Sequence, residues 1–394
     1  MHSDLPLPDS DALAHSAQLA AHLRAEILAQ GGAMPFSRFM ELALYAPGWG
    51  YYSAGARKFG SGGDFLTAPE MGALFAQATA NALAPALRAL GPQARMLELG
   101  GGSGAFAEAV LKRLAVLEAL PARYAILEPS ADLRERQRER LQGALAPELG
   151  ARVEWLDGPF QDAWEGVLFA NEVIDALPTP RFLVEGGEVY EETVELDGEA
   201  RFVRGVQPAD LLLHGAVRHV ERDLQRPFAD GYRSEVLPQL PYWIQAVAGG
   251  LRRGALLFAD YGYARSEFYQ DDRRDGTLRA FYRHHVHNDV LRWPGLQDIT
   301  ASVDFTALAE AGTGAGFDLA GYSHQAGFLL GNGIAALLED AAEGADEPER
   351  MRLRDQFKRL TLPTEMGERF QVMGFSRDVD LSAAFAMGDL TWRL

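Results

Sequence analysis

The chain has 394 residues, 47% of them hydrophobic and 23% charged, a composition that is typical of a folded globular protein and excludes a largely disordered one. Its formal net charge of -18 disfavours partners that are themselves negative, namely nucleic acid and anionic membrane surfaces, and favours a neutral or basic protein segment. It contains no cysteine, which excludes disulfides, thiolate nucleophiles and cysteine-bound zinc.

Residues 1–11 carry aspartates but no cluster of basic side chains, and no long apolar run follows them. This pattern argues against a secretory signal. No apolar stretch reaches the roughly 18 residues that a membrane-spanning helix needs, so no insertion into a membrane is expected. On these grounds we expect a cytoplasmic protein.

The N-terminal part, residues 1–90, is predicted to consist of helices around a glycine-rich loop. The leucine spacing after residue 12 has a helical period, and Gly31-Gly32 ends that helix. Residues 46–66 combine many glycines with aromatic side chains, which indicates a loop with close backbone packing. The expected helices span about 12–30, 37–44 and 69–90.

From residue 95 onward, short apolar runs alternate with helical stretches. This alternation predicts right-handed βαβ units and a parallel sheet covered on both faces. We assign residues 91–204 to the first part of this core, ending in an antiparallel hairpin with a tight turn at Asp197-Gly198. Strands are expected at 96–99, 124–127, 153–156 and 167–170, and helices at 105–117 and 131–141.

The remaining chain is predicted to hold a helical insertion, residues 205–253, and then the rest of the core, residues 254–394. The sheet resumes at 255–259 and closes with strands at 317–319 and 370–373. Residues 264–304 are predicted to be a long polar loop that acts as a lid, since long loops in compact domains are often functional. The spacing of its histidines matches no standard metal site, so no metal is expected; these are His284, His285 and His287.

A glycine-rich turn follows the first strand of this core. Gly100, Gly102 and Gly104 allow the backbone to approach a ligand and to take positive φ angles. The following helix offers unpaired N–H groups that suit an anionic group such as the methionyl carboxylate of S-adenosylmethionine. The spacing resembles the first motif of class I methyltransferases, in which Glu98 would orient the amino end of this cofactor.

The same turn also fits a dinucleotide site, because Gly100, Gly102 and Ala105 match the pattern Gly-x-Gly-x-x-Gly/Ala. Glu128 ends the second strand and could accept hydrogen bonds from the ribose of either cofactor, so it does not separate the two. Glu98 and the third glycine favour methyl transfer. A nicotinamide-dependent oxidoreductase remains the alternative.

Two residues after the third strand are candidates for contact with adenine. Asp157 could accept a hydrogen bond from the adenine amino group, with Phe160 packing near the ring. The alternative is that the pair Asp157-Gly158 is only a turn.

A polar motif, Asn171-Glu172-Val173-Ile174-Asp175, follows the fourth strand, at the edge where open parallel sheets bind ligands. If Glu172 and Asp175 converge, they could hold a guanidinium by charge-assisted hydrogen bonds and orient its lone pair toward the sulfonium, with Asn171 beside them. A strong general base is then unnecessary, because positioning supplies much of the rate. The alternative is a helix N-terminus carrying acids that stabilise it.

These motifs stand in the order found in one known family. Over about residues 36–376 the chain resembles the MidA-like class I S-adenosylmethionine-dependent methyltransferases, which include a mitochondrial complex I assembly factor that methylates a protein arginine. The resemblance implies a Rossmann-like core of seven mostly parallel strands, with helical N-terminal elements and insertions. The motifs that carry it are Pro47 to Tyr52, Gly63 to Glu70, the glycine turn, and Asn171 to Pro178.

The resemblance also implies site residues and partners. It places Gly63, Asp64 and Thr67 by the cofactor, and it suggests a protein arginine as acceptor, on a complex I subunit or assembly target. A non-catalytic assembly chaperone that retains the fold is a further alternative, in view of the acidic charge and the long insertions. The sequence leaves open the acceptor, the degree of methylation and the oligomeric state, for which a homodimer is one option.

Overall fold

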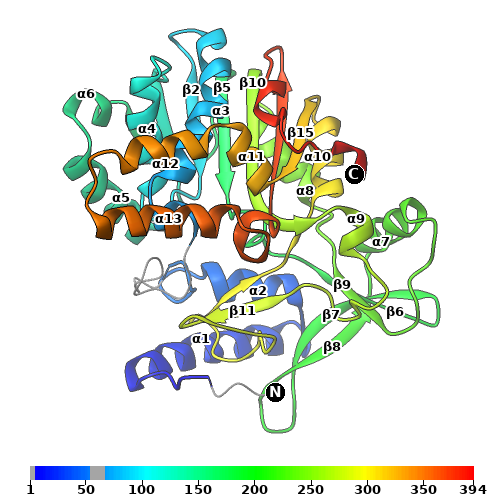
Figure 1. Ribbon diagram of the computed structural model, residues 1–394. Coiled ribbons are helices and arrows are strands. Elements are labelled where there is room, and N and C mark those ends of the chain that lie inside the picture. The colour runs from blue at the N-terminus through cyan, green and yellow to red at the C-terminus, as the bar shows by residue number, and fades with distance from the viewer. Residues whose placement is uncertain (1–4, 54–66) are drawn as a thin grey trace. The chain divides into compact units, whose positions relative to one another are not determined.

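The computed structural model describes residues 5–53 and 67–394, and the chain divides into two compact units. Each unit is assembled from three separate segments of the chain (Figure 1). The first unit comprises Met1–Phe65, Ile174–Gln239 and Tyr263–Asp304, and the second comprises Leu66–Val173, Leu240–Gly262 and Phe305–Leu394. Sequence reasoning divided the chain into consecutive stretches instead, because it could not show which distant segments pack together.

The second unit is built on seven strands in the order β15-β16-β10-β5-β2-β3-β4. Neighbouring strands from β10 to β4 run parallel, whereas β16 is antiparallel to both of its neighbours. This arrangement confirms the predicted class I core with a mostly parallel sheet. The strands are β2 (Arg95–Leu99), β3 (Arg123–Leu127), β4 (Val153–Leu156), β5 (Trp164–Asn171), β10 (Leu251–Tyr263), β15 (Asp318–His324) and β16 (Phe370–Arg377).

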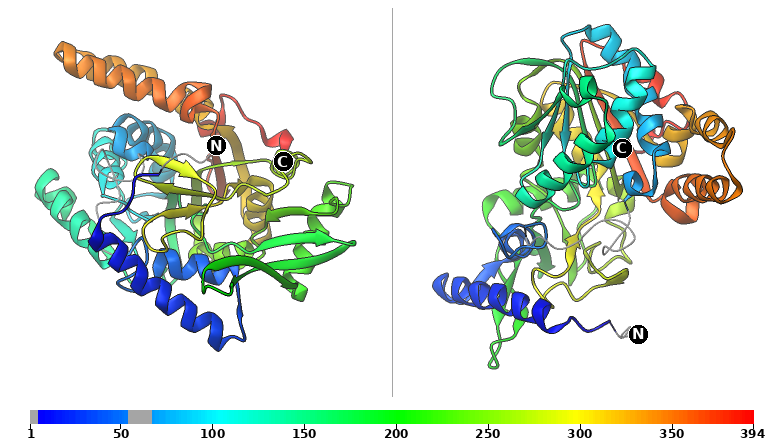
Figure 2. Two further views of the ribbon diagram at one scale, coloured as in Figure 1. Left: turned by 90° about the horizontal axis from the view of Figure 1, so that it is seen from below. Right: turned by 90° about the vertical axis from the view of Figure 1, so that its left-hand side faces the viewer.

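Helices cover both faces of this sheet, as the alternating pattern predicted. The helices on one face share a hydrophobic core with the strands, and α12 and α13 pack together there (Figures 1 and 2). On the opposite face, Trp243 of α8 lies against Phe258 of β10. The helices are α3 (Leu74–Leu90), α4 (Ala105–Val116), α5 (Ala131–Ala144), α6 (Pro147–Gly150), α8 (Leu240–Ala248), α10 (Phe305–Gly314), α11 (Gln325–Gly331), α12 (Ile334–Ala342) and α13 (Glu347–Thr361), with short turns η1 (Ala68–Met71), η2 (Pro363–Gly367), η3 (Ser382–Phe385) and η4 (Thr391–Arg393).

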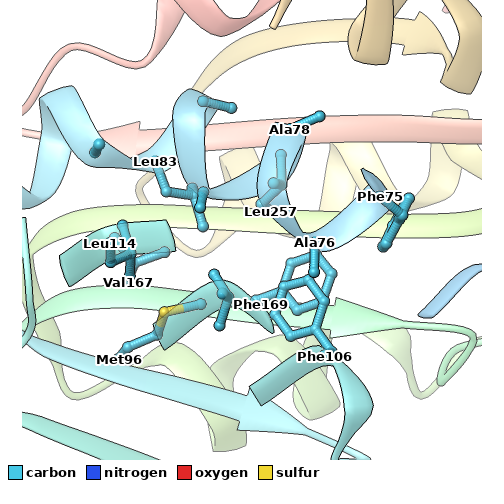
Figure 3. Packing of buried hydrophobic residues seen from close by; sticks show 14 of the residues in the cluster. Phe75, Ala76, Ala78, Leu83, Met96, Phe106, Leu114, Val167, Phe169 and Leu257 are labelled. Atoms are coloured by element: carbon cyan, nitrogen blue, oxygen red, sulfur yellow. The ribbon is translucent and has the colours of Figure 1, made fainter. Parts of the chain in front are cut away.

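Aromatic packing fixes α4 on the sheet. The rings of Phe106 in α4 and Phe169 in β5 are stacked with centroids 4.1 Å apart, and Phe75 of α3 packs beside both (Figure 3). Burying a phenylalanine side chain stabilises a fold by about 1.5–3 kcal/mol. Because α4 begins directly after the glycine turn, this packing also holds the turn in place.

The first unit contains an antiparallel sheet of five strands in which β7 pairs with β1, β6 and β8, and β6 pairs with β9. This confirms the predicted antiparallel segment, although Asp197 caps a longer turn than the tight one expected, accepting bonds from the N–H groups of Glu199 and Arg201. The strands are β1 (Ala33–Pro35), β6 (Arg181–Glu185), β7 (Glu188–Leu196), β8 (Phe202–Pro208) and β9 (Tyr232–Glu235), and the helices are α1 (Ser10–Ala29), α2 (Phe36–Tyr45) and α7 (Leu211–Asp223).

The segment 264–304, expected to be a polar loop, contains regular structure in the first unit. It begins with α9 (Arg265–Phe268) and continues into a small sheet of order β12-β11-β13, followed by β14 (Val303–Asp304). Strands of three or four residues are too short to show a clear alternating pattern, which is why the sequence did not reveal them. The strands are β11 (Arg279–Tyr282), β12 (His285–His287) and β13 (Asp298–Thr300).

None of the helices in residues 5–53 and 67–394 is long and apolar enough to cross a membrane. Within the same residues, histidine, aspartate and glutamate side chains form no group that could hold a metal ion.

Candidate cofactor and active site

The glycine turn between β2 and α4 has a backbone that favours glycine at alternate positions. Gly100, Gly102 and Gly104 have φ angles of 65°, 52° and 83°, a left-handed conformation that L side chains rarely adopt. A Cβ atom on Gly101 would lie 2.8 Å from Ile126 Cγ2, whereas one on Gly102 would meet none of the described atoms within 4 Å. The turn is therefore packed on one side and open at Gly102, which suits the close approach of a ligand.

Glu98 lies just before this turn, buried in β2 with 3% of its surface exposed. The Tyr124 hydroxyl of the neighbouring strand β3 donates a 2.8 Å hydrogen bond to its carboxylate. Burial raises the pKa of Glu98 to about 8, against the lowering effect of the Tyr124 hydrogen bond, and the nearby charge of Glu128 adds to the rise. A cationic ammonium group beside Glu98 would favour its ionised form.

Glu128 follows the adjacent strand β3 and is also buried. Its carboxylate accepts hydrogen bonds from the Ser130 N–H at 3.0 Å and from Gln137 Nε2 at 3.3 Å. Gln137 Nε2 also lies 2.9 Å from the Gly102 carbonyl oxygen, to which it donates. One side chain therefore joins the predicted ribose-binding carboxylate to the glycine turn.

The helix around Gln137 was predicted from the sequence, but this residue was not singled out. The buried residues of α5 are Leu133, Gln137 and Leu141, spaced four apart along one face. That spacing is the signal that could have identified Gln137, since positions i, i+4 and i+8 share one side of a helix.

The structure does not bring Phe160 to the turn. Its ring packs 5.0 Å from the ring of Trp164, and the Arg95 guanidinium lies 5.1 Å from its centroid. Arg95 and Trp164 are the first residues of β2 and β5, whereas the turn follows the last residue of β2. These two edges are about 16 Å apart for a five-residue strand. Phe160 is thus far from the turn because the chain runs back along the sheet after β4.

Asp157 lies just beyond the end of β4, with its side chain 97% exposed. Arg134 of α5 donates a 2.7 Å hydrogen bond to it, and the same guanidinium also donates to the carbonyl oxygens of Glu128 and Leu156. The contact with adenine predicted for Asp157 stays a prediction.

Of the three loop residues suggested by the family, Gly63 and Asp64 lie outside the described residues. Thr67 is buried and directly precedes η1. In η1, Glu70 accepts a short hydrogen bond from the hydroxyl of Ser103, a residue of the glycine turn. This contact places the chain segment that begins at Thr67 against the turn.

Asn171 and Glu172 stand at the carboxyl end of β5. Asn171 Nδ2 donates to Glu172 Oε1 at 3.1 Å, and the Glu172 N–H donates to the Ala259 carbonyl of β10 at 2.9 Å. Glu172 has a φ of 53°, which is rare for a residue other than glycine and recurs at functional sites. The next side chain, Val173, adjoins the turn, since a Cβ on Gly100 would lie 3.0 Å from its Cγ2.

Asp175 belongs to the first unit, where it is buried and its carbonyl oxygen accepts the Ala301 N–H at 3.0 Å. Tyr52 of the same unit donates to both carboxylate oxygens of Asp298, each at 3.0 Å. Burial raises the pKa of Tyr52 well above its usual value, and the charges of Asp298 and Asp175 raise it further. Asp175 thus stands among tyrosine and carboxylate groups that sequence reasoning did not connect with it. Its predicted convergence with Glu172 stays a prediction.

A family model described as S-adenosyl-L-methionine-dependent methyltransferase matches residues 78–323, which is more than half of the chain. The chain belongs to this family. It is therefore an enzyme that uses S-adenosylmethionine as its methyl donor, as the glycine turn predicted. The nicotinamide-dependent alternative is not favoured.

Solved structures and curated proteins agree with this assignment. A protein from Burkholderia thailandensis, crystallised with S-adenosyl-homocysteine, is 43% identical with a TM-score of 0.92, covering 99% of this chain and 100% of that one. The mitochondrial protein arginine methyltransferase NDUFAF7 of Danio rerio is 28% identical, covering 89% of this chain and 85% of its own length. The Homo sapiens protein of the same name is also 28% identical, covering 86% of this chain and 79% of its own length.

The prediction of a cytoplasmic location is wrong. The curated relatives are named as mitochondrial proteins, which points to mitochondria rather than to the cytoplasm. The prediction rested on the lack of a secretory signal and of a membrane helix, and neither feature distinguishes the cytoplasm from the inside of an organelle.

Proposed function

We propose that this methyltransferase modifies the guanidinium group of an arginine side chain in a protein substrate. The observation that carries the proposal is that relatives aligned over most of the chain are named protein arginine methyltransferases. Glu172 follows β5, the strand that pairs with β2, and its carboxylate has the chemistry to bind the planar, cationic guanidinium group by charge-assisted hydrogen bonds.

The cofactor fits the residues of the second unit. S-adenosylmethionine supplies an electrophilic methyl group on a sulfonium. The open turn at Gly102 and the N–H groups at the start of α4 suit the cofactor's carboxylate, and Glu98 suits its ammonium group. The Glu128 carboxylate, at the carboxyl end of the neighbouring strand β3, can accept hydrogen bonds from the ribose hydroxyls.

On the acceptor side, the proposed residues are Asn171, Glu172 and Asp175. Asn171 donates its amide N–H to Glu172, so its Oδ1 points elsewhere, and this buried oxygen has no hydrogen-bond partner among the described residues. A guanidinium N–H would satisfy it. Held in this way, the acceptor nitrogen needs correct placement more than a strong base, because the sulfonium is a good leaving group.

The test is the purified enzyme with radiolabelled S-adenosylmethionine and an extract from cells that lack the gene, followed by amino-acid analysis of the labelled protein. We expect label in methyl-arginine, and we expect Glu172→Gln to lower the rate at least about 100-fold, as the loss of a positioning contact can. Glu165→Gln is the matched control, since Glu165 is exposed on the same strand β5. Label only in other residues, or full activity of Glu172→Gln, would overturn the proposal.

Mass spectrometry of the proteome with and without the gene identifies the acceptor. The family resemblance predicts that the lost methyl-arginine lies in a complex I subunit or assembly target, and this stays a prediction. The same strains test the non-catalytic alternative. If Glu172→Gln and Asp175→Asn variants restore a deletion strain completely, the chain acts as an assembly protein and its catalysis is dispensable.

A further inference from the structure

In the second unit, a buried side-chain amide lies between the glycine turn and Glu128. Gln137 is 0% exposed, and its Nε2 donates to the Gly102 carbonyl at 2.9 Å and to Glu128 Oε2 at 3.3 Å. Its Oε1 accepts a 2.8 Å hydrogen bond from Trp155 Nε1 of β4. Every polar atom of this side chain therefore has a specific partner.

These partners fix the orientation of the amide. The indole N–H of Trp155 is a donor only, and the Gly102 carbonyl and the Glu128 carboxylate are acceptors. If the amide were rotated by half a turn, its oxygen would face two acceptors and its nitrogen would face a donor. Only the observed orientation satisfies all three neighbours.

Gln137 also packs closely against the backbone of the glycine turn. A Cβ atom on Gly101 would lie 3.1 Å from Gln137 Nε2, and one on Gly104 would lie 3.5 Å from its Cα. The backbone of the turn and the side chain of Gln137 thus fit directly against each other, and close-packed interiors transmit small displacements. A side chain of different shape at this position would therefore press on the turn, on the Glu128 carboxylate, or on both.

We propose that Gln137 is a positioning residue for S-adenosylmethionine, which holds the Glu128 carboxylate at a fixed distance from the Gly102 peptide before the cofactor binds. The proposal rests on the ribose-binding role proposed for Glu128. The Ser130 N–H holds one carboxylate oxygen and Gln137 holds the other, so the carboxylate has a defined plane. Such preorganisation increases affinity because little order has to be gained on binding.

The test is calorimetric titration of S-adenosylhomocysteine into the full-length protein and its variants. Gln137→Met keeps the shape of the side chain but removes its hydrogen bonds, and we expect about tenfold weaker binding. Gln137→Glu should bind more weakly still, because it places a second carboxylate against Glu128. In steady-state kinetics, the KM for S-adenosylmethionine should rise while kcat at saturation stays unchanged.

A double variant separates positioning from a merely structural role. If Gln137 acts through Glu128, Gln137→Met should cost clearly less affinity in a Glu128→Gln background than in the wild type. Equal losses in both backgrounds, or a Gln137→Met protein that binds as the wild type does, would overturn the proposal. If Gln137→Met fails to fold, Trp155→Phe gives the same test, because it removes the donor that orients the amide.

These variants also separate the positioning role proposed for Gln137 from the ribose-binding role proposed for Glu128. If Glu128→Gln weakens binding but Gln137→Met does not, only the positioning role of Gln137 is wrong. If the Glu128→Gln variant binds S-adenosylhomocysteine as the wild type does, the ribose-binding role of Glu128 is wrong. The positioning role proposed for Gln137 is then wrong as well, because it depends on Glu128.

Discussion

At the scale of single residues, Glu98 links cofactor binding to pH. Its buried carboxyl group has a pKa of about 8, so it is mostly protonated at neutral pH in the free enzyme. The ammonium group of the cofactor binds the ionised form better. We therefore expect the affinity for S-adenosylhomocysteine, measured by calorimetry, to rise as the pH increases toward 8, by up to about tenfold per pH unit.

Two variants show whether Glu98 causes this dependence. Glu98→Gln cannot ionise, and it should lose the rise in affinity between neutral pH and pH 8. Tyr124→Phe removes the hydrogen bond that lowers the pKa of Glu98, so the rise should move to higher pH. An unchanged pH profile in Glu98→Gln would assign the dependence to another group and remove Glu98 from the ammonium site.

Single residues also show what the sequence could and could not predict about the site. The positions of Glu98, Gly102 and Glu128 around the glycine turn were predictable because these residues stand next to strand ends, and strand ends can be read from local patterns. The hydrogen bonds of Gln137 and Asp298 were not predictable, because they join elements far apart in the chain. Phe160 was predicted near the cofactor because the sequence does not show that, after β4, the chain returns to the opposite edge of the sheet, where Phe160 packs against Trp164 and Arg95.

At the scale of elements, the strongest sequence signals were those that repeat. The strands of the parallel sheet and the helices between them appeared at the expected places, since apolar runs and helical periods extend over many residues. The short strands β11, β12 and β13 were missed, because three or four residues cannot display a period. Their pairing partners, rather than their own sequences, define them as strands.

The helix α4 gives a test of how packing supports the turn. Phe106→Ala removes the ring stacked on Phe169, and we expect a loss of about 3–5 kcal/mol in the free energy of unfolding measured with denaturant. Val116→Ala, at the exposed end of the same helix, is the control and should change stability by less than about 0.5 kcal/mol. Equal midpoints for the two variants would show that the aromatic stack does not anchor α4.

At the scale of the whole molecule, the two units are interleaved along the chain. The chain passes from the second unit to the first between Val173 and Ile174, within the motif that holds the proposed acceptor residues. Glu172 and Asp175 therefore belong to different units, although only two residues separate them. Sequence reasoning treated the motif as the start of one helix or one binding site, because a crossing between units leaves no local signal.

The net charge of -18 has a consequence for the encounter with a substrate. A strongly negative protein attracts basic segments over a distance, and salt screens this attraction beyond a Debye length of about 10 Å at 0.1 M ionic strength. We expect kcat/KM to fall by about tenfold or more between low and high salt for an acceptor peptide with lysines beside its arginine. The measurement uses the peptide around the arginine whose methylation depends on this chain.

The control is the same peptide with the flanking lysines replaced by glutamine, which should show little dependence on salt. The affinity for S-adenosylhomocysteine, measured in the same buffers, separates effects on the acceptor from effects on the cofactor site. If both peptides lose activity equally as salt increases, the acidic charge does not steer the substrate and instead serves to keep copies of the protein apart. A loss confined to the lysine-flanked peptide assigns the acidic charge to recognition of a basic protein segment, which agrees with an arginine as the methyl acceptor.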